Sequence, residues 1–167
     1  MNQFKVMRVG RAVFMAASVL VLAACFSKQA PQLPFKTITG QVIAPTDYKG
    51  QVMLVNFWAT SCTTCVKEMP GIVDTYNTFK DQGFRTVAVA MSYDRPDYVV
   101  NFAETRKLPF DVALDLDGSL AKAYDDVKIT PTTYLINRKG EIIKTYVGEP
   151  EFPALHKLIQ QALAEKS

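Results

Sequence analysis

Two cysteines separated by two residues, Cys62 and Cys65, are the part of this sequence best suited to chemistry. They follow an apolar β-type run, Val52 to Trp58, and a helical pattern begins with them. The first sulfur would therefore lie among the free N–H groups of a helix N-terminus, which stabilise a thiolate. The second would lie one turn along the same face, close enough to form a disulfide. The spacing predicts dithiol–disulfide exchange, with Cys62 as nucleophile and Cys65 as resolving thiol.

Metal binding is the alternative use of such a pair. Zinc takes four ligands, usually Cys or His, but the third cysteine, Cys25, lies in a segment that looks like a signal. The only histidine, His156, lies in the last predicted helix, beyond the sheet. Two soft thiolates alone favour Cu(I), so a non-catalytic copper-binding protein stays open as the alternative from another functional class.

The N-terminus has the composition of a targeting signal. Lys5, Arg8 and Arg11 precede an uninterrupted small and apolar run at residues 12–24, which is too short to span a bilayer comfortably. The run ends in LAAC, which resembles the lipobox of bacterial lipoproteins; the resemblance implies that Cys25 is lipidated and becomes the mature N-terminus. An ordinary signal peptide with a chance cysteine and an uncleaved anchor are the alternatives.

These features predict three parts: a lipoprotein signal peptide at 1–24, a lipidated tether at 25–33 and one domain at 34–167. The chain would be exported and held by lipid on a bacterial membrane, facing the periplasm. Without the three signal cations, sixteen basic and sixteen acidic residues remain, so the mature chain has no net charge and no electrostatic case for binding nucleic acid. Export also makes a disulfide chemically possible.

Strands and helices alternate along the domain, which predicts an α/β fold with a central mixed sheet flanked by helices. Strands are expected at residues 35–39 and 41–44, forming a hairpin, and at 52–58, 84–91, 110–114, 132–137 and 141–147. Helices are expected at 62–80, 96–107, 117–124 and 151–165.

Three motifs around this frame occur in a recognisable order: NFWAT at 56–60, EMP at 68–70 and ITPTTYLI at 129–136. Together they make the domain resemble the thioredoxin superfamily, in its TlpA/ResA-type branch of membrane-tethered bacterial oxidoreductases. The resemblance implies a thioredoxin-like fold with a central βα insertion around residues 98–107. Peroxiredoxins share the broader fold, but their P-x-x-x-T-x-x-C pattern is absent, since Ala59 stands three residues before Cys62.

Glu68 is the candidate proton carrier. It is three residues after Cys65 on the same helix face, and partial burial would raise its pKa toward neutrality, which suits a general base. The resemblance implies the same role, because Asn56 stands where ordinary thioredoxins have a buried aspartate and an amide cannot titrate. A solvated surface glutamate is the alternative.

The resemblance also implies a substrate site. It implies that the Thr130–Pro131 bond is cis, which would expose the backbone of Thr130 beside the sulfurs, where a substrate strand can pair with it. An ordinary trans proline is the alternative. Trp58 is expected to pack beneath the active-site loop and contribute to this site, with plain core packing as the alternative.

The residues around the cysteines depart from the family pattern. Ser61 and Thr64 stand where members usually have Trp and Pro, and these two residues with Thr63 are expected to tune the redox potential. The expected direction is reduction of disulfides in exported partner proteins. A membrane electron donor would then reduce the Cys62–Cys65 disulfide again. The reaction would need no cofactor beyond the cysteine pair, and the lipid bilayer would be a partner through Cys25.

Overall fold

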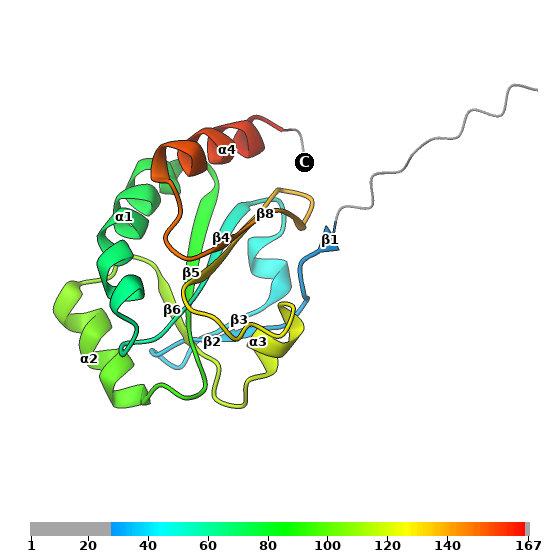
Figure 1. Ribbon diagram of the computed structural model, residues 1–167. Coiled ribbons are helices and arrows are strands. Elements are labelled where there is room, and N and C mark those ends of the chain that lie inside the picture. Colours follow the sequence, from blue (N-terminus) through cyan, green and yellow to red (C-terminus); the bar gives the residue numbers. More distant parts are fainter. Residues whose placement is uncertain (1–27, 166–167) are drawn as a thin grey trace, which may run out of the picture.

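The computed structural model describes residues 28–165 (Figure 1). Within them, six strands form one mixed sheet in the order β1-β8-β7-β4-β5-β6. The strands of this sheet are β1 (Lys28–Gln29), β4 (Val52–Trp58), β5 (Phe84–Ala90), β6 (Asp111–Leu114), β7 (Thr132–Ile136) and β8 (Glu141–Val147). The helices are α1 (Thr63–Phe79), α2 (Pro96–Arg106), α3 (Ser119–Ala123) and α4 (Phe152–Ala164), with short 3₁₀ turns η1 (Pro45–Tyr48) and η2 (Lys80–Gln82). The predicted α/β architecture, a central mixed sheet flanked by helices, is confirmed.

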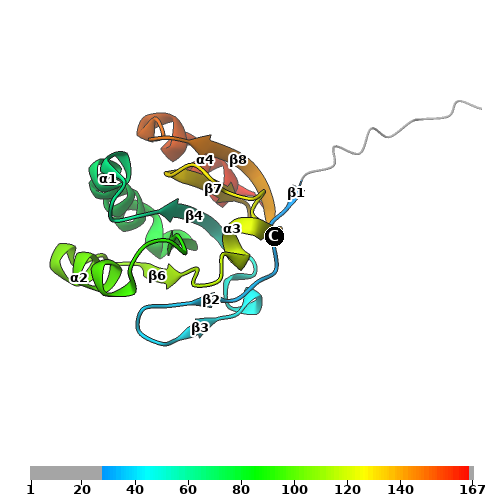
Figure 2. The same cartoon turned by 60° about the horizontal axis from the view of Figure 1, so that its bottom comes forward.

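Strand β4 is the centre of the sheet and all of its residues are buried. It runs parallel to β5 and antiparallel to β7. Side chains alternate between the faces of a strand, so Leu54 and Trp58 join one core with α1, α2 and α4, while Met53 and Phe57 join the other with α3. Figure 2 shows the helices on the two sides of the sheet, with α1, α2 and α4 on one side and α3 on the other. This explains why every residue of β4 except Asn56 is apolar.

The predicted N-terminal hairpin is present, although its paired strands, β2 (Phe35–Lys36) and β3 (Val42–Ile43), are shorter than expected. It covers the free edge of β6: the Ile38 N–H donates to the carbonyl of Val112 at 2.9 Å, and Thr37 bridges Ala113. The hairpin therefore protects one edge of the sheet from pairing with another chain.

Residues 28–30, which lie within the predicted tether, are docked against the sheet. Strand β1 pairs with the first two residues of β8, Ala30 is buried, and its N–H donates to the carbonyl of Gly140 at 2.8 Å. This segment is docked because its backbone finds partners on the open edge of β8, at the end of that strand farthest from Pro131. The predicted signal at 1–24 and Cys25 lie outside the described residues. In the part of the chain described, no helix has the length and apolar character needed to cross a bilayer.

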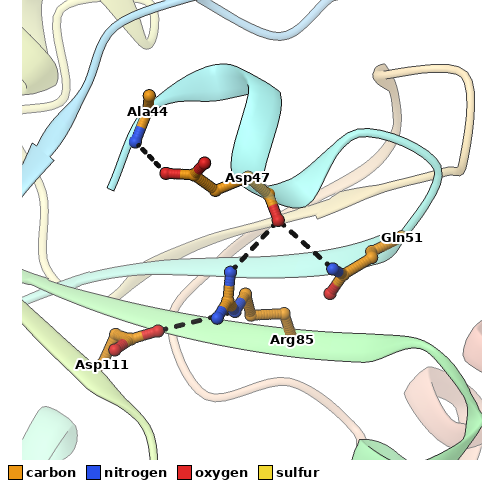
Figure 3. A network of polar contacts seen from close by, with 5 residues as sticks. All are labelled: Ala44, Asp47, Gln51, Arg85 and Asp111. Carbon is orange, nitrogen blue, oxygen red and sulfur yellow. Dashed lines mark hydrogen bonds and ion pairs between the residues drawn. The ribbon is translucent and has the colours of Figure 1, made fainter. Parts of the chain in front are cut away.

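A polar network around Asp47 secures the turn before β4 (Figure 3). One carboxylate oxygen of Asp47 accepts the N–H of Ala44 at 2.7 Å, and its main-chain carbonyl accepts from Gln51 at 3.3 Å and from Arg85 at 3.4 Å. Arg85 also pairs with Asp111 at 3.6 Å, which links η1 to β5 and β6. These contacts fix the start of β4, while the cysteines follow its other end.

Candidate active site

The cysteine pair lies where β4 ends and α1 begins. Cys62 is the N-cap residue of α1, and its Sγ accepts the N–H of Cys65 at 3.2 Å. The two sulfurs form a disulfide, with an S–S distance of 2.14 Å and Cα atoms 5.2 Å apart. Cys62 is half-buried, whereas Cys65 is completely buried. Cys62 is therefore the outer sulfur and Cys65 the inner one, which suits their predicted roles as nucleophile and resolving thiol. Ser61, Thr63 and Thr64 lie exposed around them.

The loop before β7 reaches the disulfide from the neighbouring strand. The Thr130–Pro131 peptide bond is cis, as predicted. The carbonyl oxygen of Thr130 lies 3.5 Å from Cys62 Sγ, and the carbonyl of Pro131 accepts the N–H of Gly148 at 2.8 Å. The structure thus brings Thr130 and Pro131 to the outer sulfur.

Trp58 lies inside the core. Its side chain is completely buried, its ring centroid is 5.0 Å from that of Phe102 on α2, and it shares a core cluster with Cys65. It supports the active-site loop from below but has no exposed surface to offer a substrate. The plain-core alternative describes this residue, because the alternation of β4 directs its side chain beneath α2.

Glu68 is buried rather than solvated, so the surface alternative is wrong. Its Oε1 accepts a hydrogen bond from Asn56 Nδ2 at 2.9 Å. Loss of solvent raises the pKa of Glu68 from 4.5 to about 7; the Asn56 hydrogen bond opposes this rise and the negative charge of Glu149 adds to it. A carboxyl group with a pKa near neutrality one turn from Cys65 can both accept and return a proton.

Asp94 has a role beside the cysteine pair that the sequence did not reveal. One carboxylate oxygen of Asp94 accepts the N–H of Thr60 at 2.5 Å, and the other accepts the Thr60 hydroxyl at 2.6 Å. The carboxylate therefore clamps the loop two residues before Cys62. Its neighbour Tyr93 is exposed and its hydroxyl lies 3.3 Å from the Thr130 hydroxyl, so this segment touches both loops beside the disulfide. An aspartate after a buried strand was its only signal in the sequence, and that signal does not identify a partner.

We expect Asp94→Asn to lower the free energy of unfolding of the oxidised protein by about 1–2 kcal/mol, because two hydrogen bonds to a charged carboxylate are replaced by weaker bonds to a neutral amide, whose NH₂ group cannot accept from Thr60. Urea unfolding measures this change. Asp97→Asn is the matched control, since Asp97 pairs with Arg95 on the surface of α2 and should matter little. Equal losses of unfolding free energy in the two variants would contradict a stabilising role for the hydrogen bonds from Thr60 to Asp94.

His156 gives the copper alternative no support. Its Nε2 lies 2.8 Å from the Thr75 hydroxyl, and its ring packs against Phe79 and Phe152. Across residues 28–165, no group of three or more His, Cys, Asp and Glu side chains is arranged to hold a metal ion.

Known sequences with similar features are thiol–disulfide oxidoreductases. A family model described as Redoxin matches residues 27–159. The thiol-disulfide oxidoreductase ResA of Bacillus subtilis strain 168 is 36% identical over 127 residues, covering 76% of this chain and 70% of the relative. The sporulation thiol-disulfide oxidoreductase A of the same strain is 35% identical over 132 residues, covering 75% of this chain and 79% of the relative.

Solved structures agree with these sequence relatives. The solution structure of a candidate thioredoxin from Neisseria meningitidis superposes with a TM-score of 0.78 and 39% identity, covering 84% of this chain and 93% of the other. The crystal structure of StoA from Bacillus subtilis has a TM-score of 0.64 and 33% identity, covering 76% and 98%.

Proposed function

The chain belongs to the redoxin family, and from this membership we propose that it is an exported, lipid-anchored enzyme that reduces disulfides in partner proteins. Its relatives confirm the ResA-type resemblance and the reaction class, which is thiol–disulfide exchange. The observation that carries the proposal is the disulfide at the start of α1, with one sulfur accessible and the other buried beside a carboxyl group. Substrate disulfides, a membrane electron donor and the bilayer are the proposed partners.

In the proposed cycle, the Cys62 thiolate attacks one sulfur of the partner's disulfide, and the partner's other sulfur leaves as a thiolate. Cys65 passes its proton to the Glu68 carboxylate, and the Cys65 thiolate then attacks Cys62 Sγ. This step forms the Cys62–Cys65 disulfide and releases the partner's second thiolate, so two electrons pass from enzyme to partner. A dithiol of the electron donor returns the two electrons, and the cycle needs no other cofactor.

The fold is consistent with a lipid anchor at Cys25. Strand β1 begins three residues after that cysteine and joins the end of β8 that lies away from the disulfide. An anchored domain would then present Cys62 away from the membrane, toward exported proteins. Labelling with radioactive palmitate in a bacterial host tests the anchor: the chain should take up label and Cys25→Ser should not. Equal labelling of both would contradict lipidation at this residue.

The reduction potential of the cysteine pair tests the direction of the reaction. We would equilibrate the full chain carrying Cys25→Ser, in detergent, with thiol buffers of known potential and count alkylated cysteines by mass. A value at or below about −230 mV, in the range of the glutaredoxins and thioredoxin, supports a reductant. A value near about −120 mV would instead make the protein an oxidant of exported thiols.

A further inference from the structure

A small polar cluster is buried in the core directly beneath the active-site helix. It consists of Asn56 on β4, Thr133 on β7 and Glu68 on α1, all of which are buried. Asn56 Nδ2 donates to Glu68 Oε1 at 2.9 Å and to the Thr133 hydroxyl oxygen at 2.8 Å. The amide nitrogen has two hydrogens, and this arrangement uses both of them. A buried polar group is costly unless it is bonded, so a cluster in the middle of the sheet requires a physical reason.

The register of the sheet explains how the cluster forms. Asn56 and Thr133 are directly opposite each other in the antiparallel β4–β7 pair, so their side chains leave the sheet on the same face. That face is the one covered by α1, which supplies Glu68. Two consecutive elements, β4 and α1, therefore meet the distant strand β7 at one amide group.

The two oxygens of Glu68 are not equivalent in this cluster. Oε1 is held by Asn56, whereas Oε2 is buried with no hydrogen-bond partner among the described residues. A proton on Oε2 relieves the cost of burying an unbonded carboxylate oxygen, and the N–H of Asn56 stabilises the anion when the proton leaves. Both protonation states are thus accessible: burial favours the protonated form, and the hydrogen bond from the amide shifts the balance back toward the carboxylate.

We propose that Asn56 is a positioning residue for Glu68 in disulfide exchange, and that Thr133 holds the Asn56 side chain in place beside the carboxylate. With the amide rotated by half a turn, its oxygen would face Glu68 and hold the carboxyl group in its protonated form. The Thr133 hydroxyl oxygen accepts the second amide hydrogen and so anchors the Asn56 side chain beside the carboxylate.

Other charges around Glu68 are few. Glu149, in the segment after β8, raises the pKa of Glu68 through its charge, and Lys67 pairs with Glu149 at 2.9 Å on the surface. In the reduced protein the thiols of Cys62 and Cys65 are the other titratable groups beside it. Asn56 is the group that opposes desolvation, so its removal should shift the balance toward the protonated form.

The test measures the Glu68 carboxyl directly by ¹³C NMR in the oxidised full chain in detergent micelles, with the resonance assigned by its loss in Glu68→Gln. We expect Asn56→Leu to raise the pKa of Glu68 by at least about one unit, because the hydrogen bond to the anion is lost. Thr133→Val should move it in the same direction, and Thr133→Ser, which keeps the hydroxyl, should restore it. An Asn56→Leu variant that folds with an unchanged Glu68 pKa overturns the proposal, and an unchanged value in Thr133→Val overturns the part assigned to Thr133.

A kinetic measurement connects the cluster to the reaction and rests on the proposed proton transfer by Glu68. With a disulfide-bonded model peptide, exchange by Asn56→Leu at pH 7 should fall about fivefold, as the ionised fraction of Glu68 drops from about one half to about one tenth. The rate of Asn56→Leu should recover at higher pH. When Glu68→Gln is also present, the chains with and without Asn56→Leu should exchange at the same rate. If the NMR shift occurs but the rates do not follow it, the positioning of Glu68 stands and its role in proton transfer fails.

Discussion

Replacing Cys65 with serine is expected to stop turnover and leave the protein covalently attached to its disulfide partner through Cys62. Cys62 is half-buried at the start of α1, where it can still attack a disulfide, but the second attack needs the Cys65 sulfur. A serine hydroxyl cannot form a disulfide, so the mixed disulfide has no intramolecular exit. Turnover of a disulfide substrate should fall by roughly a thousandfold or more, as when one member of a catalytic unit is removed.

The trapped adduct gives this prediction a qualitative readout. In a Cys25→Ser background, non-reducing gels and mass spectrometry should find partner proteins on Cys65→Ser that thiol reductants release. Cys62→Ser is the matched control: it removes the accessible sulfur, leaves the completely buried Cys65, and should be inactive without an adduct. Adducts on Cys62→Ser but not on Cys65→Ser would mean that the two cysteines have exchanged roles.

The sequence predicts those parts of the fold and site that depend on local pattern. Strand β4 has the predicted bounds, Val52–Trp58. Every residue of the strand is buried, so the apolar run in the sequence marks its position. The disulfide follows from the spacing of Cys62 and Cys65 and from the helix that begins there. Glu68 faces the core because it shares a helix face with Cys65.

Contacts that depend on sheet register were beyond sequence reasoning. Asn56 and Thr133 are 77 residues apart, and neither an amide nor a hydroxyl in an apolar strand indicates its partner. Strand β1 has two polar residues and no alternation to reveal it; only the open edge of β8 gives it partners. Asp94 acts on Thr60 across a turn whose course is set by packing in three dimensions. These are the residues that hold the chemistry in place, whereas the reacting atoms themselves were visible in the sequence.

Burial of Glu68 should make the stability of the oxidised protein depend on pH. Below about pH 4.5 the carboxyl group is protonated in both the folded and the unfolded state. As the pH rises from 4.5 to about 7, the unfolded chain loses this proton while the folded protein, with a pKa of about 7, keeps it. Unfolding then releases a proton, so this group lowers the free energy of unfolding as pH rises, by a total of about 3 kcal/mol, and the loss levels off above pH 7.

Glu68→Gln removes this dependence because an amide does not titrate. The variant should therefore gain about 3 kcal/mol relative to wild type between pH 4.5 and pH 8, whatever its difference at the lower pH. Comparing variant and wild type at each pH cancels the contributions of all other titrating groups, and keeping the disulfide oxidised removes those of the two thiols. Urea unfolding at both pH values measures the gain, and Glu104→Gln, exposed on α2, is the control that should show little change. A constant difference between Glu68→Gln and wild type across this range would mean that Glu68 titrates as a solvated carboxyl, and the buried proton carrier in the proposed cycle would have to be given up.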